Sequence, residues 1–324
     1  MTTRCPNCDS VDGTLEFHAP AFDADSSVPE FDLLRCSACN LVGTRGVSDA
    51  LLDEAYEASY YGAGHRKFRG GLERILATLA RQRAASMIRA WRQGGGQGTP
   101  EVCDIGCGRG VLLKAFRANG ANVLGLERSP EPIDADIASD VHLGSLDDES
   151  LADRRFDIIV IWHVLEHVHA PDHLLDAIAE HAADGALLAL AVPNYASLQR
   201  ALFGPAWFHL DLPRHLTHFE AGALQQRLVD RGFEITRVRH FDPVQNPYGF
   251  LQSALNRLAP SHAGEFYEQL KGGDGLKSES RWPMPVWISL AVLLMLPALV
   301  EAIVASLVRR GATVQITARK GKPS

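Results

Sequence analysis

The chain has 324 residues, 46% of them hydrophobic, which is enough to fill the core of an α/β domain that carries additional segments. Lysine and arginine number 32 against 39 acidic residues, and the net charge of −7 does not favour a polyanion as the main partner. No apolar stretch with a charged lead opens the chain, so we expect no secretory signal and a cytoplasmic location.

Two pairs of cysteines occur near the start of the chain, Cys5 with Cys8 and Cys36 with Cys39. Each C-x-x-C pair can present two thiolates to a tetrahedral metal, and four thiolates close the coordination sphere of a structural zinc ion. The spacing therefore predicts a zinc ribbon over residues 1–45. A redox pair and stray thiols are alternatives, but neither explains why the C-x-x-C pair occurs twice.

A long amphipathic helix is expected over residues 72–92, with apolar residues at helical spacing. A run of glycines at 94–98 follows and predicts a flexible joint. We interpret residues 46–98 as a helical lid or brace with its linker.

An apolar strand that begins near Val102 leads into a turn containing Gly106, Gly108 and Gly110, and then into a helix-like run. At the carboxyl end of a parallel strand, such glycines let the backbone approach a ligand, and the following helix offers unpaired N–H groups. The pattern predicts a nucleotide cradle. NAD is the weaker interpretation, because the third glycine comes one residue sooner than in G-x-G-x-x-G.

The downstream segments alternate between apolar strands and a helix. The expected strands are 122–127, 141–143, 156–162 and 186–192, with a helix over 170–183. The second strand of the series ends in Glu127, whose carboxylate can accept hydrogen bonds from two ribose hydroxyls. The alternation predicts a doubly wound parallel sheet.

Together these segments resemble the class I S-adenosylmethionine-dependent methyltransferases, in particular a bacterial branch that modifies glycans, quinones and similar small acceptors. The resemblance covers roughly residues 101–242 and rests on DIGCGRG (104–110), FDIIVIWHVLEHVHAP (156–171) and LALAVPN (188–194). It implies a Rossmann-like core over residues 99–242, with a final antiparallel strand of the core and a tail at 312–324.

The resemblance also implies which residues bind the cofactor, S-adenosylmethionine. The cofactor-binding set is the turn residues Asp104, Gly106, Cys107, Gly108 and Gly110 beside the methionine part, Glu127 on the ribose, Ser145 and Leu146 beside the adenine, and Tyr61 over the cofactor. For Asp104 the alternative is a carboxylate that satisfies N–H groups of the loop, and for Tyr61 it is ordinary packing.

Methyl transfer to a hydroxyl needs an oriented acceptor and a base that takes its proton, a task for which histidine is suited near neutral pH. Histidines gather after two strands, at 163, 167 and 169 and again at 209, 215 and 218. Segment 211–219 resembles a D-x-P-x-H-x-x-x-F signature of the same branch. We expect His215 to be the general base or an acceptor ligand, with His163 second. The alternatives are that His215 and His218 cap or brace the next helix, and that His163 packs or only supports the residues that contact the ligand.

Residues 163–167 also match H-x-x-E-H, a pattern of one group of zinc peptidases. We reject that interpretation, because the motif follows a sheet strand directly instead of lying on a helix. A divalent ion at His163, Glu166 and His167 is a weaker idea, which the resemblance to quinone O-methyltransferases raises.

Residues 286–308 are almost continuously apolar and have about the length of a membrane span, which takes ~20 residues. If the strand that follows pairs with 233–241, both ends of the segment lie on one side of any bilayer, which excludes a single crossing. A hairpin broken at Pro297, an apolar helix pair that forms a pocket or dimer interface, and ordinary core remain. Trp282 and Trp287, with Arg281 before and Arg309 and Arg310 after, resemble interfacial anchors.

We therefore expect a flap and an apolar helical insertion over residues 243–311, with peripheral membrane contact through 284–310 at the inner face. The expected function is O-methylation of a small or lipid-linked acceptor. One alternative is an RNA methyltransferase whose ribbon grips the nucleic acid, which the acidic net charge argues against. The other is a scaffold without catalysis, which the intact glycine turn and Glu127 argue against. The sequence gives no indication of the oligomeric state.

Overall fold

A twisted seven-stranded sheet forms the centre of the computed structural model, which describes residues 4–21, 30–56, 71–271 and 282–321. The strand order is β10-β11-β8-β7-β4-β5-β6. The strands are β4 (Glu101–Ile105), β5 (Asn122–Glu127), β6 (Val141–Leu143), β7 (Phe156–Trp162), β8 (Ala182–Pro193), β10 (Phe233–Arg239) and β11 (Thr313–Lys320). β4 to β8 pair in parallel, whereas β11 is antiparallel to both of its neighbours. This is the predicted Rossmann-like sheet with an antiparallel last strand.

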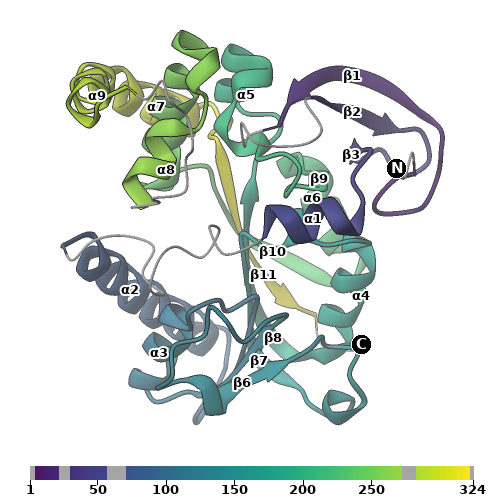
Figure 1. Cartoon of the computed structure of the whole chain (residues 1–324). Coiled ribbons are helices and arrows are strands. Elements are labelled where there is room, and N and C mark those ends of the chain that lie inside the picture. Colours follow the sequence, from purple (N-terminus) through teal and green to yellow (C-terminus); the bar gives the residue numbers. More distant parts are fainter. Residues whose placement is uncertain (1–3, 22–29, 57–70, 272–281, 322–324) are drawn as a thin grey trace.

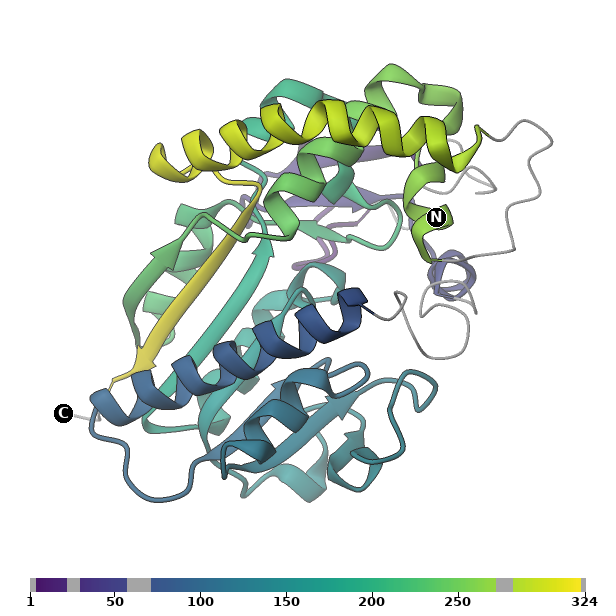
Figure 2. The ribbon, with the colours of Figure 1, turned by 90° about the vertical axis from the view of Figure 1, so that its left-hand side faces the viewer.

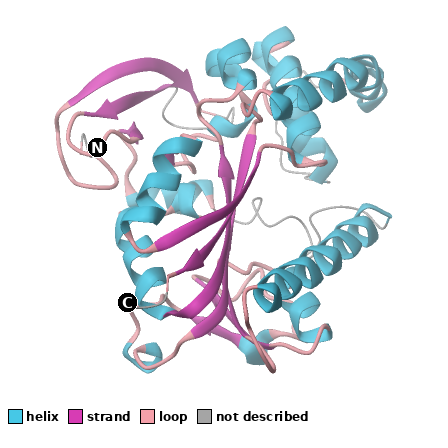
Figure 3. Cartoon of the chain, turned by 180° about the vertical axis from the view of Figure 1, so that it is seen from behind, coloured by secondary structure: helices cyan, strands magenta, loops and turns pink. Residues whose placement is uncertain are grey.

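Helices cover both faces of this sheet (Figure 1; Figure 3). On one face lie α2 (Gly71–Gln93) and α3 (Val111–Ala118), and on the other α4 (Pro171–His181) and α6 (Ala221–Asp230). Met87 and Trp91 of α2 are buried with Phe116 of α3 against Val160 of β7. The helix predicted over 72–92 is therefore present, and it braces one face of the sheet.

One boundary differs from the prediction, at the junction of α4 and β8. The helix was expected to run to residue 183 and the strand to begin at 186, but α4 ends at His181 and β8 begins at Ala182. Ala182 pairs with Phe156 of β7, so the neighbouring strand supplies hydrogen-bond partners earlier than the local sequence indicates.

A second, four-stranded sheet contains the N-terminal segment. Its order is β1-β2-β3-β9, with β1 (Gly13–Pro20), β2 (Glu30–Cys36), β3 (Val42–Arg45) and β9 (Thr217–His218). The pairs Val42↔His218 and Gly43↔Thr217 join β3 to β9 in antiparallel fashion. α1 (Asp49–Ala55) follows β3 and contributes Leu51 to the core beneath this sheet. The N-terminal segment is thus hydrogen-bonded to the loop that follows β8.

The remaining helices pack beyond the carboxyl end of β8. They are α5 (Leu198–Phe203), α7 (Gln245–Leu258), α8 (Glu265–Lys271) and α9 (Met284–Leu307). Figure 2 shows α9 lying along the outer edge of the molecule with α7 beneath it. Ala298, Ala302 and Ala305 are fully buried along its inner side.

The predicted break at Pro297 is wrong, because α9 is one continuous helix through that residue. Proline has no N–H, so the carbonyl of Leu293, four residues earlier, loses its hydrogen-bond donor within the helix. Both residues are on the exposed side of α9, while α7 supports its buried side. A hairpin and a pair of half-helices are excluded accordingly. Ordinary core is excluded too, because only 17% of the most apolar part of α9 is buried.

Trp287 is not an interfacial anchor. Its side chain is 1% exposed, lies 5.0 Å from the ring of Trp282 and packs with Leu251, Leu255 and Phe266. Its large apolar surface is used to fix α9 onto α7 and α8. Arg309 and Arg310 are exposed after the helix, and position 281 lies outside the described residues.

Candidate active site

The glycine turn lies at the carboxyl end of β4 and has a left-handed backbone at each glycine, with φ of 68° at Gly106, 52° at Gly108 and 73° at Gly110. A Cβ on Gly106 would lie 2.4 Å from Val164, and one on Gly110 would lie 2.6 Å from Ile137, so both positions also need glycine for packing. A Cβ on Gly108 would meet nothing within 4 Å. The turn is therefore open to a ligand above Gly108.

Glu127 lies at the end of β5, next to this turn. Its Oε2 accepts a hydrogen bond from the backbone N–H of Gly108 at 2.8 Å, and its Oε1 accepts one from the N–H of Arg128 at 2.9 Å. Each carboxylate oxygen can accept a further bond. Glu127 is thus held in place while still able to bind a pair of hydroxyls.

Asp104 is the last polar residue of β4 before the turn, and it is 4% exposed. Burial raises the pKa of its carboxyl to about 7, with the negative charge of Glu127 contributing in the same direction. Arg83 of α2 opposes the shift, while its guanidinium stacks 3.9 Å above the ring centre of Trp162. The two carboxylates make this end of the sheet suited to a ligand that carries positive charge.

The other predicted cofactor residues differ in their surroundings. Ser145 is exposed, and its backbone N–H donates to Asp148. The side chain of Leu146 is 1% exposed within the main core, whereas Cys107 is half-buried near Gly125. Tyr61 lies outside the described residues. Their roles stay predictions.

His163 follows β7 directly and has an unusual left-handed backbone with φ of 56°. Its Nδ1 lies 3.2 Å from Oε1 of Glu166, which is 1% exposed. Burial alone would raise the pKa of Glu166, but the bond to His163 and the neighbouring imidazoles lower it to about 2. The carboxylate is therefore ionised beneath the histidine.

His215 is 6% exposed, and its Nδ1 lies 2.9 Å from the carbonyl oxygen of His209. A carbonyl only accepts hydrogen bonds, so Nδ1 carries the proton and Nε2 of the neutral ring has a free lone pair. Oδ2 of Asp211 lies 3.7 Å from that Nε2, and Asp211 forms a bidentate ion pair with Arg214. Burial alone would raise the pKa of Asp211, but the ion pair with Arg214 and the neighbouring His215 hold this pKa far below its usual range.

The two histidine loops meet at His167 and His215, whose ring centres are 4.6 Å apart. Potential ligand atoms of Glu166, His167 and His215 all lie within 4.8 Å of one another. Burial lowers the pKa of His167 to about 4 and the pKa values of His209 and His218 to about 3, with the neighbouring imidazoles adding to the effect. Of the six histidines expected to gather, only His169 stays apart, on the surface.

Comparisons with known proteins agree with this geometry. A family model described as a methyltransferase domain matches residues 63–238, more than half of the chain. The chain belongs to this methyltransferase family.

Several curated relatives of the methyltransferase are named ubiquinone biosynthesis O-methyltransferase. The one from Shewanella pealeana is 28% identical over 103 residues, which are 29% of this chain and 44% of the relative. The one from Brucella melitensis is 27% identical over 164 residues, or 48% of this chain and 66% of the relative. The methyltransferase thus matches less than two thirds of either relative. A solved methyltransferase structure from Archaeoglobus fulgidus shares 20% identity at a TM-score of 0.47, covering 78% of this chain and 96% of that one.

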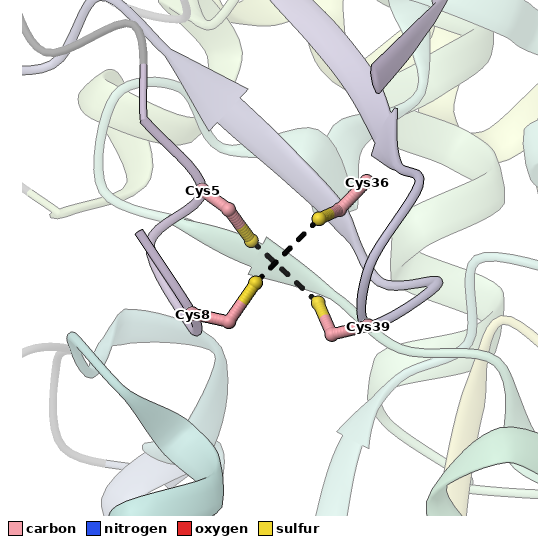
Figure 4. A group of neighbouring side chains, drawn as sticks. All are labelled: Cys5, Cys8, Cys36 and Cys39. Atoms are coloured by element: carbon pink, nitrogen blue, oxygen red, sulfur yellow. Dashed lines mark hydrogen bonds between the residues drawn. The ribbon is translucent and has the colours of Figure 1, made fainter. Parts of the chain in front are cut away.

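The four N-terminal cysteines of the methyltransferase converge as predicted (Figure 4). Sγ of Cys5 lies 3.6 Å from Sγ of Cys39, and Sγ of Cys8 lies 3.6 Å from Sγ of Cys36. Tetrahedral zinc with bonds of 2.3 Å would separate its sulfurs by about 3.8 Å. The cysteine set therefore fits a closed zinc site.

The cysteine-bearing segment contacts both histidine loops of the methyltransferase. Thr44 of β3 donates its hydroxyl proton to the carbonyl of His215 at 2.6 Å and lies 3.1 Å from Nε2 of His218. Because that proton is already used, Nε2 of His218 donates to the hydroxyl of Thr44. The N–H of Ala170 donates to the carbonyl of Pro6 at 2.7 Å.

Two further contributors escaped the sequence reasoning, Thr44 and Tyr56. Tyr56 lies just after α1, and its hydroxyl is 2.9 Å from Nδ1 of His167. Neither residue belongs to a motif, and each is more than 100 positions from its histidine. Only the pairing of β3 with β9 could have indicated Thr44.

Proposed function

We propose that the methyltransferase transfers a methyl group to a hydroxyl oxygen of a small or lipid-linked acceptor, such as a glycan or a quinone-like ring. His215 is the proposed general base, with His163 the second candidate. The observation that carries this assignment is the bond from Nδ1 of His215 to the carbonyl of His209, which leaves Nε2 able to take a proton. The relatives named as O-methyltransferases of ubiquinone biosynthesis support a hydroxyl acceptor.

The cofactor site proposed here uses the turn and the two carboxylates. Bound S-adenosylmethionine supplies an electrophilic methyl group on a positively charged sulfur. Gly106 to Gly110 would face its methionine part and Glu127 its ribose hydroxyls. Asp104 would ionise on binding, because a nearby positive charge lowers the pKa of a buried carboxyl.

In the proposed step the acceptor oxygen forms a bond to the methyl carbon while the carbon–sulfur bond breaks. The hydroxyl proton moves to Nε2 of His215. The carbonyl of His209 holds the ring in position, and Asp211, 3.7 Å from Nε2, stabilises the charge that the imidazole gains. The products are a methyl ether and S-adenosylhomocysteine.

We also propose that α9 rests on the inner face of a membrane. Among the described residues it is the one helix long and apolar enough to cross a bilayer. Crossing is incompatible with the pairing of β11, which follows α9 and lies between β8 and β10. Leu293, Leu296 and Leu307 are at least 70% exposed. A helix that lies flat with such a face would bring a lipid-linked acceptor to the enzyme.

The ribbon has a structural role in this proposal, with zinc on Cys5, Cys8, Cys36 and Cys39. Its contacts with the histidine loops do not require nucleic acid. The RNA methyltransferase stays the second candidate, because the acidic net charge of the chain argues against nucleic acid as the substrate. The divalent ion predicted near Glu166 and His167 also stays a prediction.

The first experiment is calorimetric titration of the zinc-replete enzyme with S-adenosylmethionine, with NAD as the ligand control. Glu127→Ala should weaken binding of the methyl donor, while Glu131→Ala, an exposed carboxylate on the following loop, should not. His215→Ala should then bind the donor normally but lose turnover in a screen of hydroxyl acceptors. Absence of donor binding to the wild type would overturn the proposed cofactor site, and full turnover by His215→Ala would overturn the base.

A further inference from the structure

An apolar groove of about 530 Å³ lies between α8 and α9. Among the described residues its lining is wholly apolar, and it includes Phe266 of α8 with Ile288, Ala291, Met295 and Leu299 of α9. Pockets that bind small molecules have volumes of about 300–1,000 Å³. The groove is thus large enough for a ligand, and a lining without polar side chains suits a hydrocarbon.

The floor of the groove is fixed before any ligand binds. Phe266 is 5% exposed, and the centre of its ring lies 6.2 Å from that of Trp287, which packs with Leu251 and Leu255 of α7. The α9 residues of the lining recur every three or four positions, so they form one stripe along the helix. A ligand therefore meets a preformed site, which reduces the entropic cost of binding.

The groove opens toward the exposed side of α9. Ile288 is 50% exposed, and Val292 and Leu296, which also line the groove, are 70% exposed. Leu296 belongs to the surface proposed above to rest on a membrane, so the groove and that surface are continuous. A hydrocarbon chain can accordingly pass from a bilayer into the groove without exposing its apolar surface to water.

Two other occupants are poorly suited to the groove. A helix of 24 residues is about 36 Å long and about 10 Å wide, so the outer face of α9 offers about 360 Å² to a second copy of the chain. Stable interfaces bury about 800 Å² on each partner. Residues 272–281 lie next to the groove in the sequence, but they include only one large apolar side chain, Leu276.

Aromatic contacts connect α8 to the loop that carries His209. Tyr267 follows Phe266, and its ring centre lies 5.4 Å from that of Phe208 and 6.0 Å from that of Tyr248. The rings of Phe208 and His209 are 5.2 Å apart. A single helix, about 10 Å across, thus separates the groove from this loop. A molecule whose chain lies in the groove can reach the loop with its polar end.

We propose that this groove holds the hydrocarbon chain of a lipid-linked methyl acceptor. The chain would leave the bilayer beside α9 and lie against Phe266, while its head group stays on the side of the histidine loop. The methyltransferase would accordingly select its acceptor partly by the chain. That the bound molecule is the methyl acceptor rests on the proposed function, but the chain site itself does not.

The test measures chain binding without membranes. 1-Hexanol, 1-octanol and 1-decanol are titrated separately by calorimetry into the full-length, zinc-replete protein. Burial of each added CH₂ group should raise the affinity about fourfold, or about sixteenfold for each step of two carbons, until the chain fills the groove. A dependence on chain length of this size indicates burial of the chain in an apolar site.

The variant Ala291→Phe fills part of the groove with an aromatic ring and should weaken binding of 1-decanol by about tenfold or more. Val300→Phe is the matched control, because Val300 is on the exposed side of α9 and does not line the groove. It should bind the alcohol as the wild type does. Both variants keep α9 apolar, so both should still cosediment with phosphatidylcholine–phosphatidylglycerol vesicles, which separates the groove from the flat membrane surface.

The proposal would be overturned if the wild type bound no alcohol, if affinity did not increase with chain length, or if Ala291→Phe bound 1-decanol as tightly as the wild type. Loss of cosedimentation together with alcohol binding would also overturn it, because the groove would then be only part of the membrane surface. A wild-type dimer in sedimentation velocity that Ala291→Phe abolishes would assign the groove to a second copy instead.

If Ala291→Phe fails to fold, Met295→Gln replaces a lining thioether by an amide of similar length. This variant should weaken binding of 1-decanol by about threefold or more, and unchanged binding decides against the groove. Titration with S-adenosylmethionine separates the two ideas. Donor binding without alcohol binding refutes only the chain site, whereas alcohol binding without donor binding refutes only the methyltransferase site.

Discussion

Replacement of Thr44 by valine tests whether the N-terminal sheet holds the catalytic loop in place. Thr44 is 3% exposed, and its hydroxyl donates to the carbonyl of His215 and accepts from Nε2 of His218. Valine keeps the shape of the side chain but leaves both buried groups without a partner. Each unsatisfied group costs about 1–3 kcal/mol, so Thr44→Val should lower the free energy of unfolding by about 2–6 kcal/mol.

The matched variant is Thr44→Ser, which retains the hydroxyl and loses only a buried methyl group worth about 1 kcal/mol. Urea-induced unfolding of the two variants and the wild type gives the comparison. Thr44→Val should also lower kcat while leaving affinity for S-adenosylmethionine unchanged, because the cofactor turn lies on β4 and β5, and Thr44→Ser should restore turnover. Equal stability of the valine and serine variants within about 0.5 kcal/mol would refute the reasoning.

Three further predictions concern pH, the membrane and the metal. The pKa values of His167, His209 and His218 are lowered in the folded chain, so the unfolded chain binds up to three more protons between pH 6.5 and 4. The raised pKa of Asp104 has the opposite effect, because it makes the folded chain bind one proton more. Because the unfolded chain then binds more protons than the folded chain, stability should fall by about a few kcal/mol as the pH is lowered over this range, and a flat stability profile would contradict this. The double variant Leu293→Asp with Leu296→Asp should no longer cosediment with phosphatidylcholine–phosphatidylglycerol vesicles. The control Val229→Asp, on the exposed side of α6, should still cosediment. Retained cosedimentation of the double variant would argue against membrane contact. Chelation should release one zinc ion per chain and increase hydrogen exchange over 211–219 without loss of cofactor binding, and unchanged exchange would show that the ribbon does not support that loop.

Much of the central sheet could be predicted because its signals are local. β5, β6 and β7 have the expected bounds, since each is a short apolar segment between turn residues. The glycine turn and Glu127 were likewise fixed by neighbouring residues, and the structure joins them through the N–H of Gly108. The pairing of β11 with 233–239 was found from the resemblance, not from periodicity.

The features that escaped prediction depend on contacts between distant residues. Composition predicts an apolar helix at 284–307, but only the tertiary structure shows that Pro297 lies on its open side and Trp287 on its buried side. The same holds for Thr44, whose surroundings come from a segment more than 170 residues further along the chain. No local pattern could place Thr44 beside the histidines.

The position of β11 has a consequence for how the protein is made. This strand leaves the ribosome after every other strand of the large sheet, yet it occupies an interior position between β8 and β10. Until it arrives, β8 presents an unpaired hydrogen-bonding edge, and β10 has no partner among the described strands. α9 therefore emerges while the sheet is incomplete, and its apolar surface can meet a bilayer during synthesis. Nascent chains that stall before residue 313 would carry both the open edge and the apolar helix, which makes them targets for chaperones and proteases.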